Sequence, residues 1–267
     1  MATLQALLFD VDGTLADTER DGHRPAFNMA FAEAGLDWVW DEALYGKLLA
    51  VTGGKERIRY YLDAFNTTFE KPDDFDAFVK GLHEAKTRFY TQLMAEGKIP
   101  LRPGVENLIL EARAAGMRLA IVTTTTPANV TALLESTLGP GSEDWFEVIA
   151  AGDIVPAKKP APDIYEWALR EMKLSPEEAI AFEDSGNGAR SSLGAGVKTI
   201  VTVNGYTKDD DFTGAALVVD HLGSEQRPLE TAGGQAIERG GLDLECIRGI
   251  FANQLGGAQS SDVIVRG

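Results

Sequence analysis

The sequence predicts an α/β fold, with a Rossmann-like parallel sheet at its core and an α-helical domain inserted after the first strand. Two observations predict it. After Gly104, short apolar runs alternate with segments of helical periodicity, and before that point only helical periodicity follows the first strand. At 267 residues and 44% hydrophobic, the chain can bury one large core with a smaller satellite domain. The expected domains are a core of residues 1–15 and 96–220, a helical domain of residues 16–95 and an extension of residues 221–267.

The first strand is the apolar run Ala6 to Phe9, which stops at Asp10 and is followed two residues later by Asp12. Sites in open α/β sheets form just outside the carboxyl ends of strands. Of two carboxylates there, one can attack an electrophile and the other can pass a proton to the leaving group. A divalent cation such as Mg²⁺ would relieve their repulsion. A surface turn also explains Asp-x-Asp-Gly. The calcium-loop pattern does not fit, because Gly comes too early and no Glu follows at the required spacing.

Helical spacing of apolar residues follows in the segments 24–34, 55–65 and 73–96. No strand-like run of comparable strength interrupts them, so the inserted domain is predicted to be helical. From Gly104 onward we expect helices near 105–115, through Leu133, and near 164–172 and 188–193. The expected strands are 119–122, 148–150, 179–182, 198–203 and 217–219. Such alternation predicts a mainly parallel sheet covered on both faces.

Three further polar groups fall at the carboxyl ends of the predicted strands. Thr123 and Thr124 offer a hydroxyl and backbone amides to phosphate oxygens, although loop and helix-cap threonines are common. Lys159 is a compact positive charge in a segment stiffened by prolines; a solvated surface lysine is the alternative. Glu183 and Asp184 end the strand AIAF, where a metal would compensate their burial; a helix cap facing water is the other explanation.

Composition restricts the partners and the compartment. A net charge of −16 argues against nucleic acid and anionic membranes as partners. The single Cys246 permits no internal disulfide, and no apolar run reaches the roughly 20 residues of a membrane span. The first residues lack the features of a signal peptide. We therefore expect a cytoplasmic protein, and we expect a monomer. The segment after residue 220 keeps helical spacing around Leu244 and Ile247, which predicts one docked helix between flexible segments.

The order Asp-x-Asp-Gly-Thr, Thr, Lys-Pro and Glu-Asp-Ser resembles the haloacid dehalogenase superfamily of phosphotransferases over about residues 4–220. The resemblance implies that Asp10 is the nucleophile forming an aspartyl-phosphate and that Asp12 is the general acid and base. It implies that Thr123 and Lys159 hold the phosphoryl group. It also implies that Asp10, the Asp12 carbonyl and Asp184 bind Mg²⁺ with support from Glu183, and that the helical domain is the family's cap. Dehalogenases of the superfamily do not use the second aspartate, so its presence favours phosphoryl transfer.

Several stretches, among them VTGGKERIRYYL and AAGDIVPAKKPAPDIYEWALRE, resemble the CbbY group of Calvin-cycle phosphatases. That resemblance implies conversion of xylulose 1,5-bisphosphate to xylulose 5-phosphate, which removes an inhibitor of Rubisco. The second phosphate needs a basic receptor, for which Gly53, Gly54 and Lys55 at a helix start are candidates, with Arg57 or Arg59 one turn on. The remaining candidates, for sugar hydroxyls or phosphate, are Glu19, His23 and Arg24. The sequence has one extra residue between Glu19 and His23 compared with the group, and an ordinary helix face would also explain His23 and Arg24.

Two other functions share these motifs. A phosphosugar mutase of β-phosphoglucomutase type uses the same two aspartates and a similar cap. A Mg²⁺-dependent phospho-aspartate regulatory module would use Asp10 without turnover, but Asp12 and a complete cap argue against it.

Overall fold

A computed structural model of the chain describes residues 2–51, 53–223 and 241–252. The chain forms two compact units: a sheet unit of Met1–Asp17 and Pro100–Gly267, and a helical unit of Thr18–Ile99. In the part of the chain described, no helix is long and apolar enough to cross a membrane.

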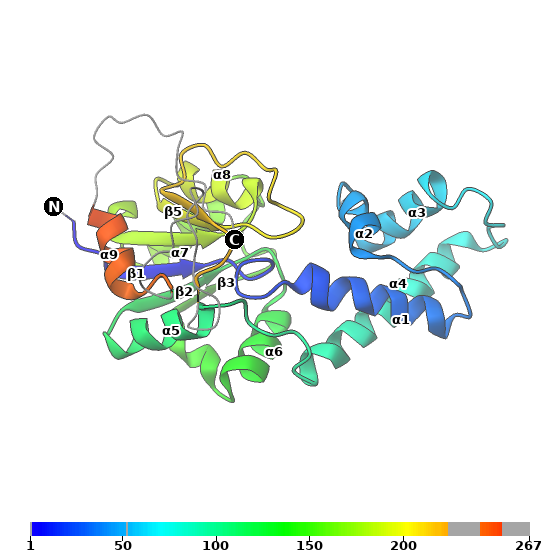
Figure 1. The fold of residues 1–267 in the computed structure, drawn as a ribbon, viewed down its shortest axis with the longest axis horizontal. Coiled ribbons are helices and arrows are strands. Elements are labelled where there is room, and N and C mark those ends of the chain that lie inside the picture. Colours follow the sequence, from blue (N-terminus) through cyan, green and yellow to red (C-terminus); the bar gives the residue numbers. More distant parts are fainter. Residues whose placement is uncertain (1, 52, 224–240, 253–267) are drawn as a thin grey trace. The chain divides into compact units, whose positions relative to one another are not determined.

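The sheet unit is built on a parallel sheet, whose strands are drawn as arrows in Figure 1. Its strands are β1 (Ala6–Phe9), β2 (Arg118–Val122), β3 (Val148–Ala150), β4 (Ala179–Glu183), β5 (Lys198–Thr202) and β6 (Leu217–Val219). They lie in the order β3-β2-β1-β4-β5-β6, and every neighbouring pair is parallel. The predicted α/β class with a parallel sheet is confirmed. The chain moves from β1 to β2 on one side and then returns to β4 on the other, so the sheet has a switch point between β1 and β4.

The sheet is buried on both faces, which explains why its strands are continuous apolar runs. All four residues of β1 are buried. One face, which includes Leu8, packs against Ile164, Tyr165 and Ala168. On the other side, the rings of Phe9 and Phe182 stack with centroids 4.7 Å apart.

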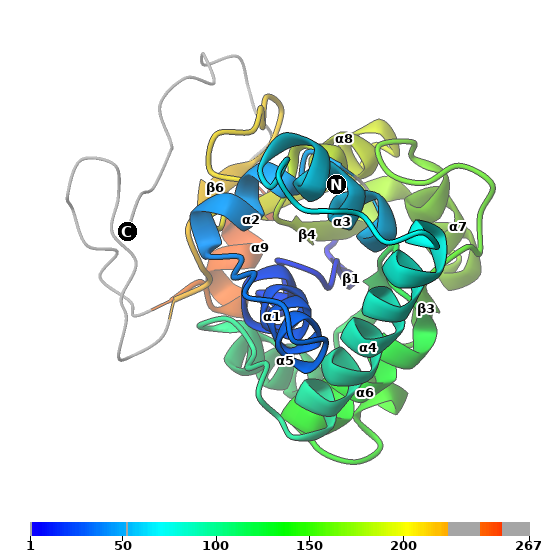
Figure 2. The same ribbon diagram turned by 90° about the vertical axis from the view of Figure 1, so that its right-hand side faces the viewer.

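Helices cover both sides of this sheet. The elements are α5 (Val105–Ala114), α6 (Pro127–Leu138), α7 (Asp163–Met172), α8 (Gly186–Gly194), α9 (Leu244–Ala252) and the 3₁₀ turns η2 (Ser142–Trp145) and η3 (Pro176–Glu178). Figures 1 and 2 show α5 and α8 on opposite sides of the strands. The Thr126 side chain caps α6 and the Ser185 side chain caps α8. These two helices therefore begin directly after the loops that follow β2 and β4.

The helical unit consists of a π-helical turn η1 (Thr18–His23) and the helices α1 (Arg24–Glu33), α2 (Glu42–Leu48), α3 (Gly54–Ala64) and α4 (Phe75–Ala95). Helix α1 packs along α4. Large rings form the core of this unit, with Trp40 fully buried against Phe27 and Phe31 at centroid distances of 4.7 and 4.8 Å. Helix α2 was not predicted: it has only seven residues, too few for helical spacing to be recognised, and Asp41 caps it.

The predicted C-terminal helix corresponds to α9, which contacts α5. The main-chain N–H of Leu244 donates to the Glu111 carboxylate, 3.1 Å away. The predicted flexible segments on either side fall largely on residues 224–240 and 253–267, which lie outside the described residues.

Candidate active site

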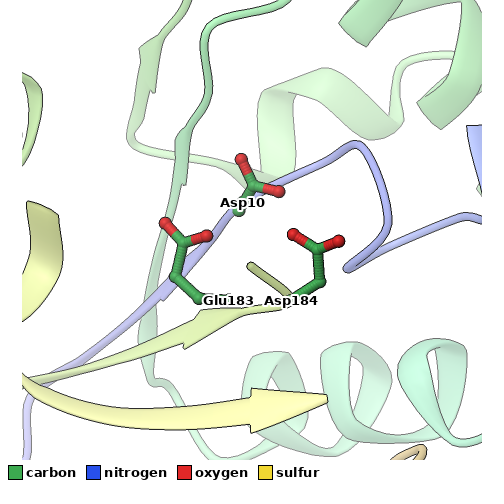
Figure 3. Close-up of side chains that lie close together, drawn as sticks. All are labelled: Asp10, Glu183 and Asp184. Carbon is green, nitrogen blue, oxygen red and sulfur yellow. The ribbon is translucent and has the colours of Figure 1, made fainter. Parts of the chain in front are cut away.

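Three carboxylates converge at the switch point of the sheet, as Figure 3 shows. Asp10 directly follows β1, Glu183 is the last residue of β4, and Asp184 comes next. One ligand oxygen from each lies within 4.8 Å of those of the other two, and all three residues are buried. Strands β1 and β4 are parallel neighbours in which Phe9 pairs with Phe182. The residues that follow the two strands therefore lie side by side. The register of the sheet therefore assembles this cluster.

Lys159 supplies the positive charge of the cluster. Its Nζ donates to Asp10 Oδ1 and Glu183 Oε1, both at 2.7 Å, and to the carbonyl of Val122 at 2.9 Å. Burial alone would lower the pKa of Lys159, but the charges of Asp10 and Glu183 outweigh it and raise that pKa above its usual value. Lys159 is therefore a permanent cation, and it does not exchange protons during a reaction near neutral pH.

Glu183 is completely buried, and its two oxygens have different surroundings. Oε1 accepts from Lys159 and from the hydroxyl of Tyr165 at 2.5 Å. Oε2 has no hydrogen-bond partner among the residues described. It packs so closely against Gly188 that an added Cβ there would lie 1.8 Å away. Burial raises the pKa of Glu183 to about 7, although Lys159 opposes the shift.

Asp184 is held by Asn204, whose side-chain amide donates to Oδ2 at 2.8 Å. Burial, reinforced by the charges of Asp10 and Glu183, raises the pKa of Asp184 well above its usual value. An unpaired buried carboxylate oxygen and two carboxylates that ionise reluctantly indicate a missing positive charge. The donor set consists entirely of oxygens, which suits Mg²⁺. The residues therefore fit a hard divalent cation.

The predicted residues of the neighbouring loops lie at the same edge of the sheet. The Thr14 hydroxyl donates to Asp10 Oδ2 at 3.1 Å. Asp12 is partly buried in the tight loop after β1, in which the Gly13 N–H donates to the Ala16 carbonyl at 2.7 Å. Thr123 follows β2 and is buried, and its hydroxyl accepts from the Thr125 N–H at 3.3 Å. Thr124 is exposed.

In the helical unit, Glu19 and Arg57 are brought together by Tyr45. The Tyr45 hydroxyl donates to Glu19 Oε2 at 2.5 Å, and Arg57 Nη1 donates to the same hydroxyl at 2.7 Å. Arg57 Nη1 also lies 3.6 Å from Glu19 Oε2. Within residues 18–51 and 53–99, the buried Nε of Arg57 has no hydrogen-bond partner. Arg57 thus orients a carboxylate and keeps one unused donor.

His23 stacks on Tyr90 with ring centroids 4.0 Å apart, and its Nδ1 lies 2.8 Å from the ammonium of Lys86. Burial lowers the pKa of His23 to about 3; Glu19 opposes the shift, and the charges of Lys86 and Arg57 reinforce it. His23 is therefore neutral near pH 7, and Nδ1 accepts from Lys86. Residues 18–23 form η1, whose wider π-helical turn accommodates one more residue than an α-helical turn, as the extra residue expected before His23 would require.

The other candidates of the helical unit have different environments. Arg24 is bound within the unit, because its guanidinium donates to the Trp40 carbonyl at 3.5 Å and lies 3.7 Å from Glu42. Gly53 precedes α3 with φ of 97°, a value that favours glycine. Gly54 begins the helix, and Lys55 is exposed. The side chain of Lys55 therefore lies at the surface beside the start of α3.

Sequence reasoning missed Tyr165, Asn204 and Lys86. Tyr165 is buried on the apolar face of α7, where helical spacing does not distinguish it from core residues. Asn204 follows β5 closely, so the rule that located the carboxylates at strand ends would have found it. Lys86 is four residues from both Leu82 and Tyr90, and all three are buried in α4. A lysine in an apolar stripe is the signal that could have revealed it.

Comparison with known proteins identifies the family. A family model described as haloacid dehalogenase-like hydrolase matches residues 4–196. The CbbY protein of Cereibacter sphaeroides is 50% identical over 217 residues, covering 81% of this chain and 92% of that protein. The plasmid-encoded CbbY of Cupriavidus necator is 46% identical over 226 residues, covering 85% of this chain and 89% of that protein.

Solved structures extend these matches. CbbY from Rhodobacter sphaeroides has been solved in complex with phosphate and, as a mutant, in complex with xylulose 1,5-bisphosphate. Each of these structures is 49% identical and covers 82% of this chain and 95% of that chain, with a TM-score of 0.68. The resemblance that the motifs indicated, to the superfamily and to the CbbY group, is confirmed, as is the prediction of an enzyme. The chain belongs to the haloacid dehalogenase-like hydrolase family.

Proposed function

We propose that this chain is a Mg²⁺-dependent sugar-phosphate phosphatase that converts xylulose 1,5-bisphosphate to xylulose 5-phosphate. The observation that supports the chemistry is the buried cluster of Asp10, Lys159, Glu183 and Asp184. The substrate is inferred from a CbbY structure, 49% identical to this chain, that was solved with xylulose 1,5-bisphosphate. The reaction would remove an inhibitor of Rubisco, which suits a cytoplasmic enzyme of the Calvin cycle.

The proposed reaction has two steps. In the first, a carboxylate oxygen of Asp10 attacks phosphorus, the bond from phosphorus to the sugar oxygen breaks, and Asp12 gives that oxygen a proton. In the second, Asp12 takes a proton from a water molecule, the water oxygen attacks phosphorus, and the bond to Asp10 breaks. Inorganic phosphate leaves, and both aspartates return to their initial states.

Charge stabilisation is assigned to the residues around Asp10. Lys159 and the Thr123 hydroxyl would hold the phosphoryl oxygens, and the exposed Thr124 would assist at the edge of the site. Asp10, Asp184 and the Asp12 carbonyl would hold Mg²⁺, with Glu183 in support. When bound, Mg²⁺ would supply positive charge that stabilises the phosphoryl group during transfer.

The helical unit is proposed to recognise the sugar and the phosphate that does not react. Lys55 and the backbone N–H groups of Gly53 and Gly54 offer an exposed charge and donors at a helix start. Arg57 holds Glu19 through Tyr45 and retains its Nε for a ligand. Glu19 and His23 are assigned to sugar hydroxyls. Arg24 is assigned a supporting role, because it is already bound to α2 and to the segment before it.

A phosphosugar mutase is the second candidate. A putative β-phosphoglucomutase from Thermotoga maritima is 27% identical and has a TM-score of 0.65, covering 81% of this chain and 94% of that chain. The two activities share the first step and differ in the fate of the phosphoryl group. A mutase returns it to a sugar, whereas a phosphatase releases it.

The test is inorganic phosphate release, with Mg²⁺, from xylulose 1,5-bisphosphate, ribulose 1,5-bisphosphate and β-glucose 1-phosphate. Selective release from the xylulose compound is expected. The mutase would be the correct function if no compound releases phosphate and glucose 1-phosphate is converted to the 6-phosphate after priming with a bisphosphate. Stoichiometric phosphorylation of the protein without turnover would instead indicate a regulatory module.

A further inference from the structure

Arg102 lies in the segment through which the chain re-enters the sheet unit, two residues before Gly104. Its main-chain N–H donates to the Leu15 carbonyl at 2.8 Å. The preceding Leu101 forms an antiparallel bridge with Ala16. This segment therefore pairs with the end of the loop that begins after Asp10.

The side chain of Arg102 is 6% exposed, and all three of its nitrogens have partners. Nη1 donates to the Gly13 carbonyl and to the carbonyl and hydroxyl of Thr202, the latter two at 2.8 and 3.0 Å. Nη2 donates to the carbonyls of Val203 at 2.6 Å and Asp220 at 2.5 Å. Nε lies 3.2 Å from Asp17 Oδ1. One guanidinium thus connects the loop after β1 with the ends of β5 and β6.

These contacts are more than stability requires. Burying a guanidinium costs free energy, and an apolar side chain of similar volume often serves stability equally well. A planar fork with five donors does what an apolar group or a lysine cannot, because it sets the relative positions of several carbonyls at once. The geometry of Arg102 therefore indicates a role in placing the loop.

Two of the carbonyls that Arg102 holds belong to neighbours of functional residues. Gly13 follows Asp12, and Val203 precedes Asn204, whose amide donates to Asp184. At Gly13, where φ is 89°, an added Cβ would lie 2.1 Å from Asp184 Oδ2 and 2.9 Å from Asn204 Nδ2. The loop, Asp184 and Asn204 are therefore in direct contact, and Arg102 binds the main chain on both sides of that contact.

We propose that Arg102 is a positioning residue that places the Asp12 loop against Asp184 and Asn204. It touches neither substrate nor reacting atoms and acts through the carbonyls of Gly13 and Val203. The effect of Arg102 on catalysis rests on the proposed function, in which Asp12 transfers the proton and Asp184 binds the metal. The effect of Arg102 on the position of the loop does not depend on that function.

The kinetic test compares Arg102→Met and Arg102→Lys with Arg118→Met in the complete protein with Mg²⁺. Arg118 is the matched control, because it also binds a carboxylate and a carbonyl, those of Glu147 and Met172, but at the amino end of β2. Loss of a residue that positions a metal-binding side chain typically lowers metal affinity or activity by about 10–100-fold. We expect kcat of Arg102→Met to fall by that factor with KM nearly unchanged, Arg102→Lys to recover part of the loss, and Arg118→Met to keep wild-type kcat.

The structural test is amide hydrogen exchange in the protein stripped of metal. Arg102→Met should exchange faster by about tenfold or more at residues 12–16 and 202–205, while β1 and β2 keep their protection. Unchanged exchange in those segments would overturn the proposal, and so would an equal kcat loss in Arg118→Met. If Arg102→Met does not fold, Arg102→Lys decides by the same exchange comparison. A wild-type protein that releases no phosphate would refute the proposed function, and the exchange result would still decide the role of Arg102.

Discussion

The charged clusters of the two units differ in the sign of the charge that they leave uncompensated. At the edge of the sheet, the carboxylates of Asp10, Glu183 and Asp184 lie close together, and the ammonium of Lys159 pairs with those of Asp10 and Glu183. When all are ionised, two negative charges remain. The raised pKa values of Glu183 and Asp184, caused first by burial, reflect this excess. Such a cluster favours a cation.

The cluster of the helical unit has the opposite sign. Glu19 lies among the cations Arg57 and Lys86, and His23 is neutral because burial lowers its pKa to about 3. One positive charge remains, and the buried ammonium of Lys86 lies 5.1 Å from the ring centroids of both Phe27 and Tyr90. Such a cluster favours an anionic or hydroxyl-rich ligand. The comparison predicts that the sheet cluster performs chemistry and the helical cluster selects the substrate.

The largest expected effect is that of Asp10→Asn. The change removes the nucleophile, so phosphate release should fall on the order of 10⁴-fold or more. It also removes one of the repelling charges, so the metal-free variant should unfold at a temperature no lower than that of the wild type. Steady-state phosphate release and a thermal unfolding curve measure the two effects. Turnover near the wild-type rate would refute the chemical role of the sheet cluster.

Asp12→Ala should have the next largest effect. Without its proton transfer, release should slow by about 10²–10⁴-fold, and mainly in the second step, because water must be activated there. Rapid-quench kinetics should show a burst of xylulose 5-phosphate followed by slow phosphate release. Release of xylulose 5-phosphate and of phosphate at wild-type rates would contradict the assignment.

The sheet cluster should also make stability depend on pH and Mg²⁺ together. Burial raises the pKa of Glu183 from 4.5 to about 7 without metal, so the folded chain binds more protons than the unfolded chain between these values. The metal-free fold is then stabilised fully below about pH 4.5 and loses that contribution as pH rises through 7, by at most about 1.4 kcal/mol per pH unit. Mg²⁺ should therefore raise the unfolding temperature more at about pH 7.5 than at about pH 5.5.

Glu183→Gln tests this linkage. Unfolding temperatures of the metal-free variant should depend less on pH than those of the wild type, with a residual slope from Asp184, whose pKa burial shifts in the same direction. A slope equal to that of the wild type would show that Glu183 does not carry the effect.

Lys55→Ala tests the role of the helical unit in selecting the substrate. Only a bisphosphate carries a second phosphate that Lys55 can bind. KM for xylulose 1,5-bisphosphate should therefore rise about tenfold, while KM for a small monophosphate changes little. Lys80→Ala, another exposed lysine of the same unit, is the matched control and should leave both values unchanged. An equal rise of KM for both substrates would show that Lys55 does not bind the second phosphate.

The smallest expected effect is that of His23→Gln on stability. The unfolded chain protonates this histidine near pH 6.5, whereas the folded chain keeps it neutral down to about pH 3. The wild type should therefore lose stability as pH falls through this window, by at most about 1.4 kcal/mol per pH unit. Urea unfolding at about pH 7 and about pH 5 should show a smaller difference for the variant. An equal difference would mean that His23 is not buried as a neutral base.

The sheet and its cluster were predictable because parallel strands bring distant residues to one edge. Asp10, Lys159 and Asp184 come from three separated parts of the sequence, and each was identified by its place after an apolar run or beside prolines. Tyr165 was not identified, because its ring belongs to the apolar face of α7 and only its hydroxyl reaches Glu183. A side chain with both an apolar body and a polar end looks like core in a sequence pattern.

The helical unit was less predictable for a related reason. Helical spacing indicates which residues face the core, but it does not indicate which polar group enters it. Lys86 is buried on the same stripe as Leu82 and Tyr90, and its partner His23 comes from a π-helical turn that helical periodicity cannot reveal. A cluster of side chains from several helices therefore cannot be predicted without a structure, whereas a cluster of residues at strand ends can be.

The most direct test of the central claim is to locate the covalent phosphoryl group. Asp12→Ala is mixed with xylulose 1,5-bisphosphate and Mg²⁺, quenched in acid, digested, and its peptides are analysed by mass spectrometry. The account predicts one phosphoryl group on the peptide that contains Asp10, and none when Asp10→Asn is added to the same variant. A phosphoryl group on another residue, or phosphate release with no covalent species at any quench time, would contradict it.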